Sequence, residues 1–287
     1  MKTRNFYYVI EPGVGEYQDD DTHKPVWTVP IVVMRKGSRD IVKAFLSVFG
    51  DHNRIFMFKI GVPKFDEENA EKDLEIVQEV KETVIAVLRL TYDLQAEIHP
   101  PTFFADEEDE KPYSVGLKMQ QLLNENFQLN YDNIRASFVN AWPIKYHLKL
   151  FSYGIYPVLP LEFRFLSLYK LLELNFKGKG QWGPAYDKLL AGFKGEYTTL
   201  NVSNLKFRNY IENLRDRCAH IKSKREDVPM GITMLNNKDA IEVDKVIPLM
   251  IKICASVINS HEENKGLQIQ RHTKTAPPVQ PEQQQEQ

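Results

Sequence analysis

One short stretch of the chain combines an arginine, an acidic residue and a histidine: Arg215, Asp216 and His220, within Asn213-Leu-Arg-Asp-Arg-Cys-Ala-His220. The unperturbed pKa of histidine lies close to neutral pH, so histidine can accept or donate a proton there. Arginine keeps its positive charge, and its planar fork matches the oxygens of a phosphate group. These residue types are therefore suited to proton transfer beside an anionic group.

A helix is predicted over residues 203–222, which contain this stretch. Its apolar stripe consists of Phe207, Tyr210, Ile211, Leu214 and Cys218. A neighbouring flank carries Arg208, Glu212, Arg215 and Ala219 at spacings of three and four, which places Arg215 next to the core face. His220 is about 140° around an ideal helix from Arg215. The two side chains can converge if the helix ends or loosens near His220, or if a second subunit brings its own copy.

The motif resembles that of the HEPN superfamily: an arginine, a polar residue, three variable residues and a histidine. Here the matching residues are Arg215, Asp216, the spacer Arg217-Cys218-Ala219, and His220. Predicted helices at 161–176 and 244–260 precede and follow the motif, in the order expected for such a bundle. The resemblance covers roughly residues 160–260 and implies a HEPN-like helical bundle. The family usually has one more helix, which residues 131–141 or the helix from Asp66 can supply.

The resemblance also implies an activity, which is metal-independent cleavage of RNA through attack by its own 2′-hydroxyl. His220 would be the general acid or base, Arg215 would stabilise charge on the phosphoryl oxygens, and Asp216 would orient one of them. The family forms its cleft between two protomers, so a homodimer without cofactor or metal is expected. A role in bacterial defence or a toxin-like stress response follows, with an antitoxin or another protein as a further partner. The basic residues near the motif are expected to contact the RNA backbone: Arg217, Lys222, Lys224 and Arg225.

Two other interpretations are compatible with the same residues. A HEPN-like bundle can dimerise and bind a nucleotide, a nucleic acid or a protein without cutting anything. Alternatively, Arg215 pairs with Glu212 or Asp216 on the surface, while His220 interacts with the last carbonyl groups of its helix and with the helix dipole.

The composition is that of an ordinary globular protein. The 287 residues are 43% hydrophobic and 26% charged, with a net charge of −2, so RNA binding would require a local basic patch. Two cysteines exclude a disulfide framework and a cysteine-rich zinc site. Cys218 and Cys254 both lie on apolar stripes and are expected in the core. The chain has neither a signal-like start nor a run of transmembrane length, which favours a cytoplasmic protein without membrane contact.

The predicted fold class is mainly α, with a small N-terminal α+β element over residues 1–62. Strands are expected at 6–10, 26–34 and 53–60, and a short helix at 39–49, where Ile41, Ala44, Phe45 and Val48 recur at helical spacing. Residues 63–141 form a helical region, with helices at 66–94, 114–126 and 131–141. The acidic stretch 105–112 within it is expected to be a solvated loop rather than a metal site.

The third predicted segment is the HEPN-like bundle over residues 142–262. It begins with a connecting stretch at 142–160 that is rich in proline, glycine and aromatic residues. Further helices are expected at 161–176 and 184–193, and a hairpin or irregular excursion over 231–243. Asp244 is expected to cap the last helix, with Pro248 in its first turn. Residues 263–287 have few apolar side chains and are expected to be disordered.

Overall fold

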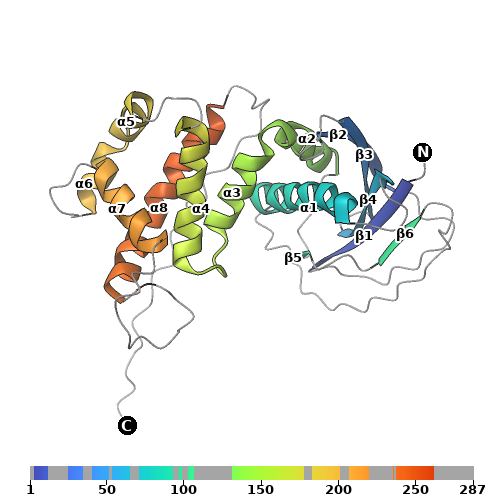
Figure 1. Cartoon of the computed structure of the whole chain (residues 1–287), viewed down its shortest axis with the longest axis horizontal. Coiled ribbons are helices and arrows are strands. Elements are labelled where there is room, and N and C mark those ends of the chain that lie inside the picture. Colours follow the sequence, from blue (N-terminus) through green and yellow to red (C-terminus); the bar gives the residue numbers. More distant parts are fainter. Residues whose placement is uncertain are drawn as a thin grey trace, which may run out of the picture.

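The computed structural model describes residues 3–11, 25–34, 41–51, 54–64, 71–92, 97–98, 103–106, 131–177, 183–200, 207–219, 235 and 237–261. An antiparallel sheet lies at one end of the molecule and a helical bundle at the other, with α1 (Glu71–Tyr92) and α2 (Tyr131–Ala141) between them (Figure 1). The described part is mainly helical with an N-terminal sheet, as the sequence predicted.

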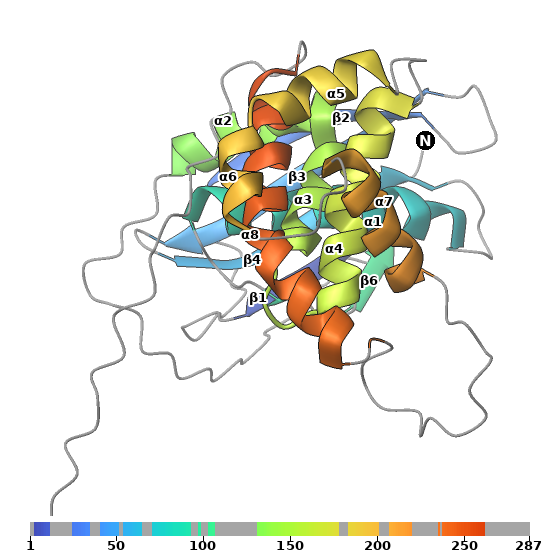
Figure 2. The same cartoon turned by 90° about the vertical axis from the view of Figure 1, so that its left-hand side faces the viewer.

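The bundle end of the molecule contains most of the helices. Its elements are η2 (Trp142–Ile144), α3 (Lys145–Ile155), α4 (Leu161–Leu172), the π-helical turn η3 (Glu173–Lys177), α5 (Pro184–Ala191), α6 (Lys194–Thr199), α7 (Phe207–Ala219) and α8 (Asn237–Asn259). Helix α4 contacts α3, α7 and α8, and these four helices lie together when the bundle faces the viewer (Figure 2). The motif helix therefore packs directly on α4.

Within the described residues the sheet has six strands, five of them in the order β2-β3-β4-β1-β5, and β6 also pairs with β1. The strands are β1 (Thr3–Glu11), β2 (Trp27–Met34), β3 (Ile41–Asp51), β4 (Arg54–Pro63), β5 (Glu97–Ile98) and β6 (Phe103–Asp106). All pairs are antiparallel. The predicted helical region 63–141 thus also contributes two short strands to the sheet.

Strand β3 corrects the prediction of a helix at 39–49. Its residues Val42, Ala44, Leu46 and Val48 are buried. The alternate residues Ile41, Lys43 and Phe45 are exposed, so burial over residues 41–46 has the period of two that a strand requires. Strand β3 pairs with β2 on one side and with β4 on the other, and these pairs satisfy its backbone N–H and C=O groups. A helix at this interior position would leave the facing backbone groups of β2 and β4 without these partners.

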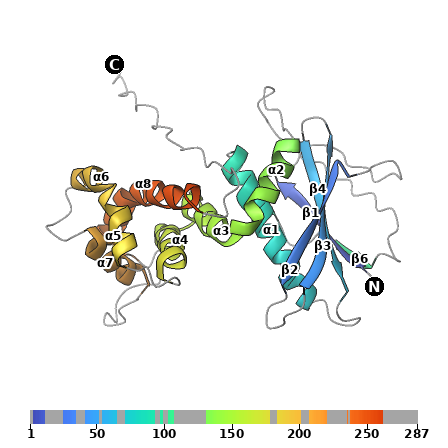
Figure 3. The same cartoon turned by 90° about the horizontal axis from the view of Figure 1, so that it is seen from above.

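Helices α1 (Glu71–Tyr92) and α2 (Tyr131–Ala141) cover one face of the sheet (Figure 3). A buried ion pair joins β1 to α1, with 3.1 Å between Arg4 Nη1 and Asp73 Oδ2. The Trp142 indole donates a hydrogen bond of 3.2 Å to the Val32 carbonyl oxygen.

The helices predicted at 66–94 and 131–141 are confirmed as α1 and α2, with the bounds Glu71–Tyr92 and Tyr131–Ala141. The predicted cap Asp66, the helix at 114–126 and the tail 263–287 lie outside the described residues.

Three expectations for the bundle were wrong: the connection at 142–160, the hairpin or irregular excursion over 231–243, and the start of the last helix at Asp244. The stretch 142–160 is not merely a connection, because it contains α3, whose buried Leu148 and Phe151 pack into the bundle. Residues 240–243 belong to α8, which begins at Asn237, and Pro248 lies inside the helix rather than in its first turn. Val243 is fully buried in the bundle, and this packing stabilises the N-terminal turns of α8 that precede Asp244. Among the described helices, none combines the length and apolar character needed to cross a membrane.

Candidate functional site

Arg215 lies near the C-terminal end of α7, on the side that faces α4. Its guanidinium carbon is 5.3 Å from the centroid of the Tyr169 ring of α4. Its Nε atom is 3.2 Å from Asp216 Oδ1, and 33% of its side-chain surface is exposed. This Nε atom has no hydrogen-bond partner among the described residues, so the contact with Asp216 is an ion pair without hydrogen-bond geometry. Arg215 is therefore held against a ring and beside a carboxylate, and is still partly open to solvent.

Tyr169 is the residue of α4 that supports Arg215. It is 1% exposed, and burial raises its pKa to about 12 against the opposing effect of the Arg215 charge. Glu173 and Glu212 also act to raise this pKa, so both carboxylates lie near the tyrosine. At neutral pH the hydroxyl is therefore protonated, and Tyr169 positions Arg215 rather than accepting a proton.

The polar flank of α7 is organised as the helical spacing predicted. Arg208 Nε lies 3.1 Å from Glu212 Oε1, four residues on. Arg208 Nη1 also lies 3.6 Å from Asp187 Oδ2 of α5. Because Glu212 pairs with Arg208, the acidic partner of Arg215 is Asp216, the second of the two partners that the sequence allowed.

Arg217 points to a different neighbour, helix α8. Its Nη2 lies 2.6 Å from Glu242 Oε2, and its Nη1 donates to Asp239. Burial would lower the pKa of Arg217, but hydrogen bonds and charges from Glu242 and Asp239 outweigh burial and raise it. Arg217 thus joins α7 to α8. A contact between Arg217 and RNA stays a prediction, and it would have to compete with these two carboxylates.

The other members of the predicted site lie outside the described residues: His220, Lys222, Lys224 and Arg225. The described part of α7 ends at Ala219, one residue before His220. Convergence of Arg215 and His220 therefore stays a prediction, as does the basic patch.

Both cysteines are buried free thiols, which confirms that they belong to the core. Burial raises the pKa of Cys218 to about 12 and raises that of Cys254 as well. The Cys254 thiol donates to the Leu168 carbonyl oxygen at 3.3 Å. Neither thiol is an accessible nucleophile. The residues that the structure describes include no group of three or more His, Cys, Asp and Glu side chains that could hold a metal ion.

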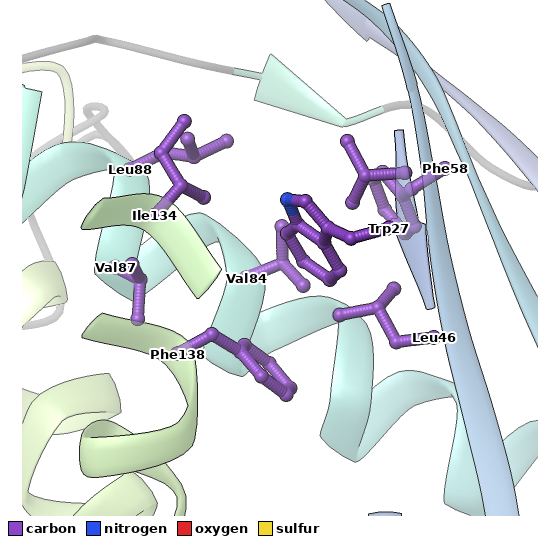
Figure 4. Close-up of a pocket in the computed structure, with 9 residues that line it drawn as sticks. Trp27, Leu46, Phe58, Val84, Val87, Leu88, Ile134 and Phe138 are labelled. Carbon is purple, nitrogen blue, oxygen red and sulfur yellow. The ribbon is translucent and has the colours of Figure 1, made fainter. Parts of the chain in front are cut away.

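A small cavity between the sheet and its helices does not extend the site. Apolar side chains from the sheet, α1 and α2 surround it (Figure 4), among them Leu46, Val84 and Phe138. It leaves about 10 Å³, room for roughly one water-sized sphere. The Trp27 Nε1 atom at this cavity has no hydrogen-bond partner among the described residues. A water molecule needs two or more polar partners, so this space is a packing defect rather than a binding pocket.

Tyr169 was not among the predicted site residues. The contact with Arg215 joins residues on two helices, and no local spacing marks it. Comparisons with protein-family models, with curated proteins and with solved structures gave no match. The geometry around Arg215 therefore has to support any functional conclusion by itself.

Proposed function

We propose that the bundle is a HEPN-type, metal-independent endoribonuclease in which Arg215 stabilises charge on the scissile phosphate and His220 transfers a proton. The observation that carries the proposal is the setting of Arg215. Its guanidinium rests on the Tyr169 ring beside Asp216, with a third of the side chain exposed, five residues before His220. A fixed but accessible cation is what a phosphoryl-transfer site requires.

The reaction needs little from the protein beyond charge and a proton. The 2′-hydroxyl oxygen of one nucleotide attacks the adjacent phosphorus while the bond to the 5′-oxygen breaks. One proton leaves the 2′-hydroxyl and one reaches the leaving 5′-oxygen, and His220 provides one or both transfers. Negative charge grows on the phosphoryl oxygens, where Arg215 would bind.

Anchoring of Arg215 supports this role in energetic terms. A donor that already points at the developing charge needs no reorganisation, and loss of one such donor commonly costs about 10²–10³ in rate. The Tyr169 ring restricts the guanidinium from one side. The Asp216 carboxylate at 3.2 Å restricts it further, which is the orienting role proposed for Asp216.

The helix arrangement is compatible with the family. In this proposal α3 takes the place of the additional helix, for which the sequence had suggested residues 131–141 or the helix from Asp66, and the motif helix α7 follows α4 and precedes α8 in the chain. In this proposal the protein acts in the cytoplasm as a homodimer whose two α7 helices share a cleft. The biological setting would be defence or a toxin-like stress response, with RNA as substrate and an antitoxin or another protein as partner.

The test is RNA cleavage in EDTA by the wild type, Arg215→Ala and His220→Ala. Arg208→Ala is the matched control, because Arg208 lies on the same helix with a side chain 28% exposed and is also ion-paired. Cleavage should be lost in the first two variants and kept in the control. Equal cleavage by all proteins would overturn the proposal. Binding of RNA without cleavage would point instead to the non-catalytic module. Light scattering should show a dimer.

A further inference from the structure

An open groove lies between α3 and the C-terminal end of α4, away from the side of α4 on which Arg215 packs. It encloses about 640 Å³, and its lining includes Tyr146, Lys149, Lys170, Glu173, Leu174 and Lys177. We propose that this groove binds single-stranded RNA, with its lysines on the phosphates and Tyr146 against a base. The inference deepens the proposed function, because it assigns the surface that would deliver RNA to Arg215.

The groove is built on an unusual piece of backbone. The π-helical turn Glu173–Lys177 follows α4 directly and contributes Glu173, Leu174 and Lys177 to the lining. Single π turns are rare and are frequent at functional sites, because they widen the helix and redirect its side chains. In this chain the turn brings an acidic, an apolar and a basic side chain to one surface.

The lysines of the groove exceed its carboxylates. Lys170 Nζ lies 3.2 Å from one oxygen of Glu173, and Lys177 Nζ lies 3.4 Å from the other. Burial would raise the pKa of Glu173, but hydrogen bonds and charges from both lysines outweigh burial and lower it. One carboxylate is thus shared by two ammonium groups, which leaves excess positive charge. The side chains of Lys170 and Lys177 are 67% and 62% exposed and can turn toward phosphates.

The α3 side of the groove supplies a third lysine, Lys149, which contacts Glu82 of α1. The Lys149 side chain is 36% exposed and its ammonium group carries three donors, so it can contact a phosphate while it stays beside Glu82. Lysines from two different helices therefore border one groove, an arrangement that suits a charged backbone running between them.

Apolar surface lies between these lysines. Tyr146 is 54% exposed and Leu174 is 42% exposed. The Tyr146 hydroxyl donates to Glu79 Oε1 at 3.3 Å, which fixes the ring at the start of α3. A fixed, exposed aromatic ring among lysines is the combination that binds unpaired bases, because every base can stack on it. An acidic peptide would need the lysines but not the ring.

The groove is linked to Arg215 through α4. Glu173 and Arg215 both lie close enough to Tyr169 for their charges to act on its hydroxyl. Tyr169 and the groove residue Lys170 are consecutive in α4. Lys170 and Tyr169 lie about 100° apart around the helix, so a strand leaving the groove would pass around the end of α4 before it reaches the guanidinium of Arg215.

The test is fluorescence anisotropy with a labelled 2′-O-methyl oligoribonucleotide, which cannot undergo 2′-hydroxyl attack. Binding by the full-length protein is measured between about 50 and 200 mM salt. Each phosphate contact to a single strand contributes about 0.7 to the log–log salt slope, so Lys170→Ala/Lys177→Ala should reduce the slope by about 1.4. Lys245→Ala/Lys252→Ala removes the same charge from exposed positions of α8 and should leave the slope unchanged.

Tyr146 separates RNA from an acidic peptide as the occupant. Tyr146→Ala should weaken binding at least about fivefold, whereas Tyr146→Phe keeps the ring, loses only the hydrogen bond to Glu79, and should weaken binding much less. Wild-type protein that binds no oligonucleotide, or groove variants that bind as well as wild type, would overturn the inference. Displacement of the oligonucleotide by polyglutamate that depends on the lysines but not on Tyr146 would also overturn it. Cleavage without groove-dependent binding rejects only the groove, and binding without cleavage rejects only the nuclease.

Discussion

The guanidinium of Arg215 lies over the ring of Tyr169, 5.3 Å from its centroid, and thereby joins α7 to α4. The ring is buried and the arginine is partly exposed, so the contact is anchored from the α4 side. The same arginine is thus both a packing residue and the proposed phosphate ligand. Stability and cleavage have to be measured on the same variants to separate these two roles.

A double-mutant cycle of Arg215→Ala and Tyr169→Leu should reveal a coupling free energy of about 0.5–2 kcal/mol, since a cation–π contact is worth that much. Urea denaturation of the wild type, both single variants and the double variant measures it. Lys252→Ala combined with Tyr169→Leu is the control and should be nearly additive, because Lys252 pairs with Glu196. Additivity in the Arg215 cycle would show that the ring contributes nothing to holding the guanidinium.

The pairing of Arg217 with Asp239 and Glu242 should contribute measurably to stability. Arg217→Ala is expected to lower the free energy of unfolding by about 1–3 kcal/mol, because it removes two charge-assisted hydrogen bonds between helices. Arg217→Lys should restore only part of this free energy of unfolding, since an ammonium group cannot bind two carboxylates in the fixed planar geometry of a guanidinium group.

The control for Arg217 is Lys252→Ala. Lys252 pairs with Glu196, and the two side chains are 47% and 46% exposed, so its loss should cost about 0–1 kcal/mol. If both variants lose the same stability, or if Arg217→Ala loses none, Arg217 is not a structural link and its predicted contact with RNA gains weight.

Local patterns predicted the helices that have continuous apolar stripes. They could not decide whether a short amphipathic segment forms a helix or a strand. In β3, Ile41, Ala44, Phe45 and Val48 fit a helical spacing, while Val42, Ala44, Leu46 and Val48 fit a strand. The choice between them comes from β2 and β4, which pair with β3 on both sides. Such partners are distant in sequence, so propensity alone cannot weigh them.

The prediction of where α8 begins failed for a similar reason. Asn236-Asn-Lys-Asp239 has the composition of a turn, yet Asp239 stands in the first turn of α8. Acidic residues are favourable at a helix N-terminus, and Asp239 also binds Arg217 of α7. The first signal was present in the sequence, whereas the second exists only once α7 and α8 pack together.

For the candidate site, too, the sequence predicted the contacts within one helix but not the contacts between helices. The helical spacing correctly placed Arg215 beside the core face and Arg208 within reach of Glu212. The support from Tyr169 and the link from Arg217 to α8 both cross between helices. These contacts depend on how the helices pack, which a single sequence does not encode in any local pattern.

Gly154 in α3 should tolerate no side chain. A Cβ atom there would lie 2.4 Å from the Leu168 side chain of α4, so Gly154→Ala forces the two helices apart. Overpacking of this kind costs about 1–3 kcal/mol, which a urea or thermal unfolding experiment detects. Gly195→Ala is the control, because nothing lies within 4 Å of its added Cβ atom. Its stability should be equal to or above wild type, and equal losses in both variants would contradict the close α3–α4 packing.

The tyrosines predict how stability falls at high pH. Burial raises the pKa of Tyr8 to about 12, and burial together with the charge and hydrogen bond of Glu82 raises that of Tyr153 to about 12 against the effect of Arg89. The ordinary value is 10.0, so folding favours the protonated hydroxyls. The contribution of these two tyrosines to the free energy of unfolding is therefore fully present below about pH 10 and is lost as the pH rises through about 12.

Urea denaturation between about pH 9 and 12 should show this loss, and tyrosinate absorbance should show a late-titrating group of tyrosines. Tyr8→Phe is the informative variant, because it removes one ionisable hydroxyl from the buried face of the sheet while it keeps the ring that stacks on Phe58 at 5.1 Å. The free energy of unfolding of Tyr8→Phe should depend less steeply on pH over this range. The same dependence as in the wild type would mean that the Tyr8 hydroxyl titrates near its ordinary pKa and is not shielded by the α1 layer.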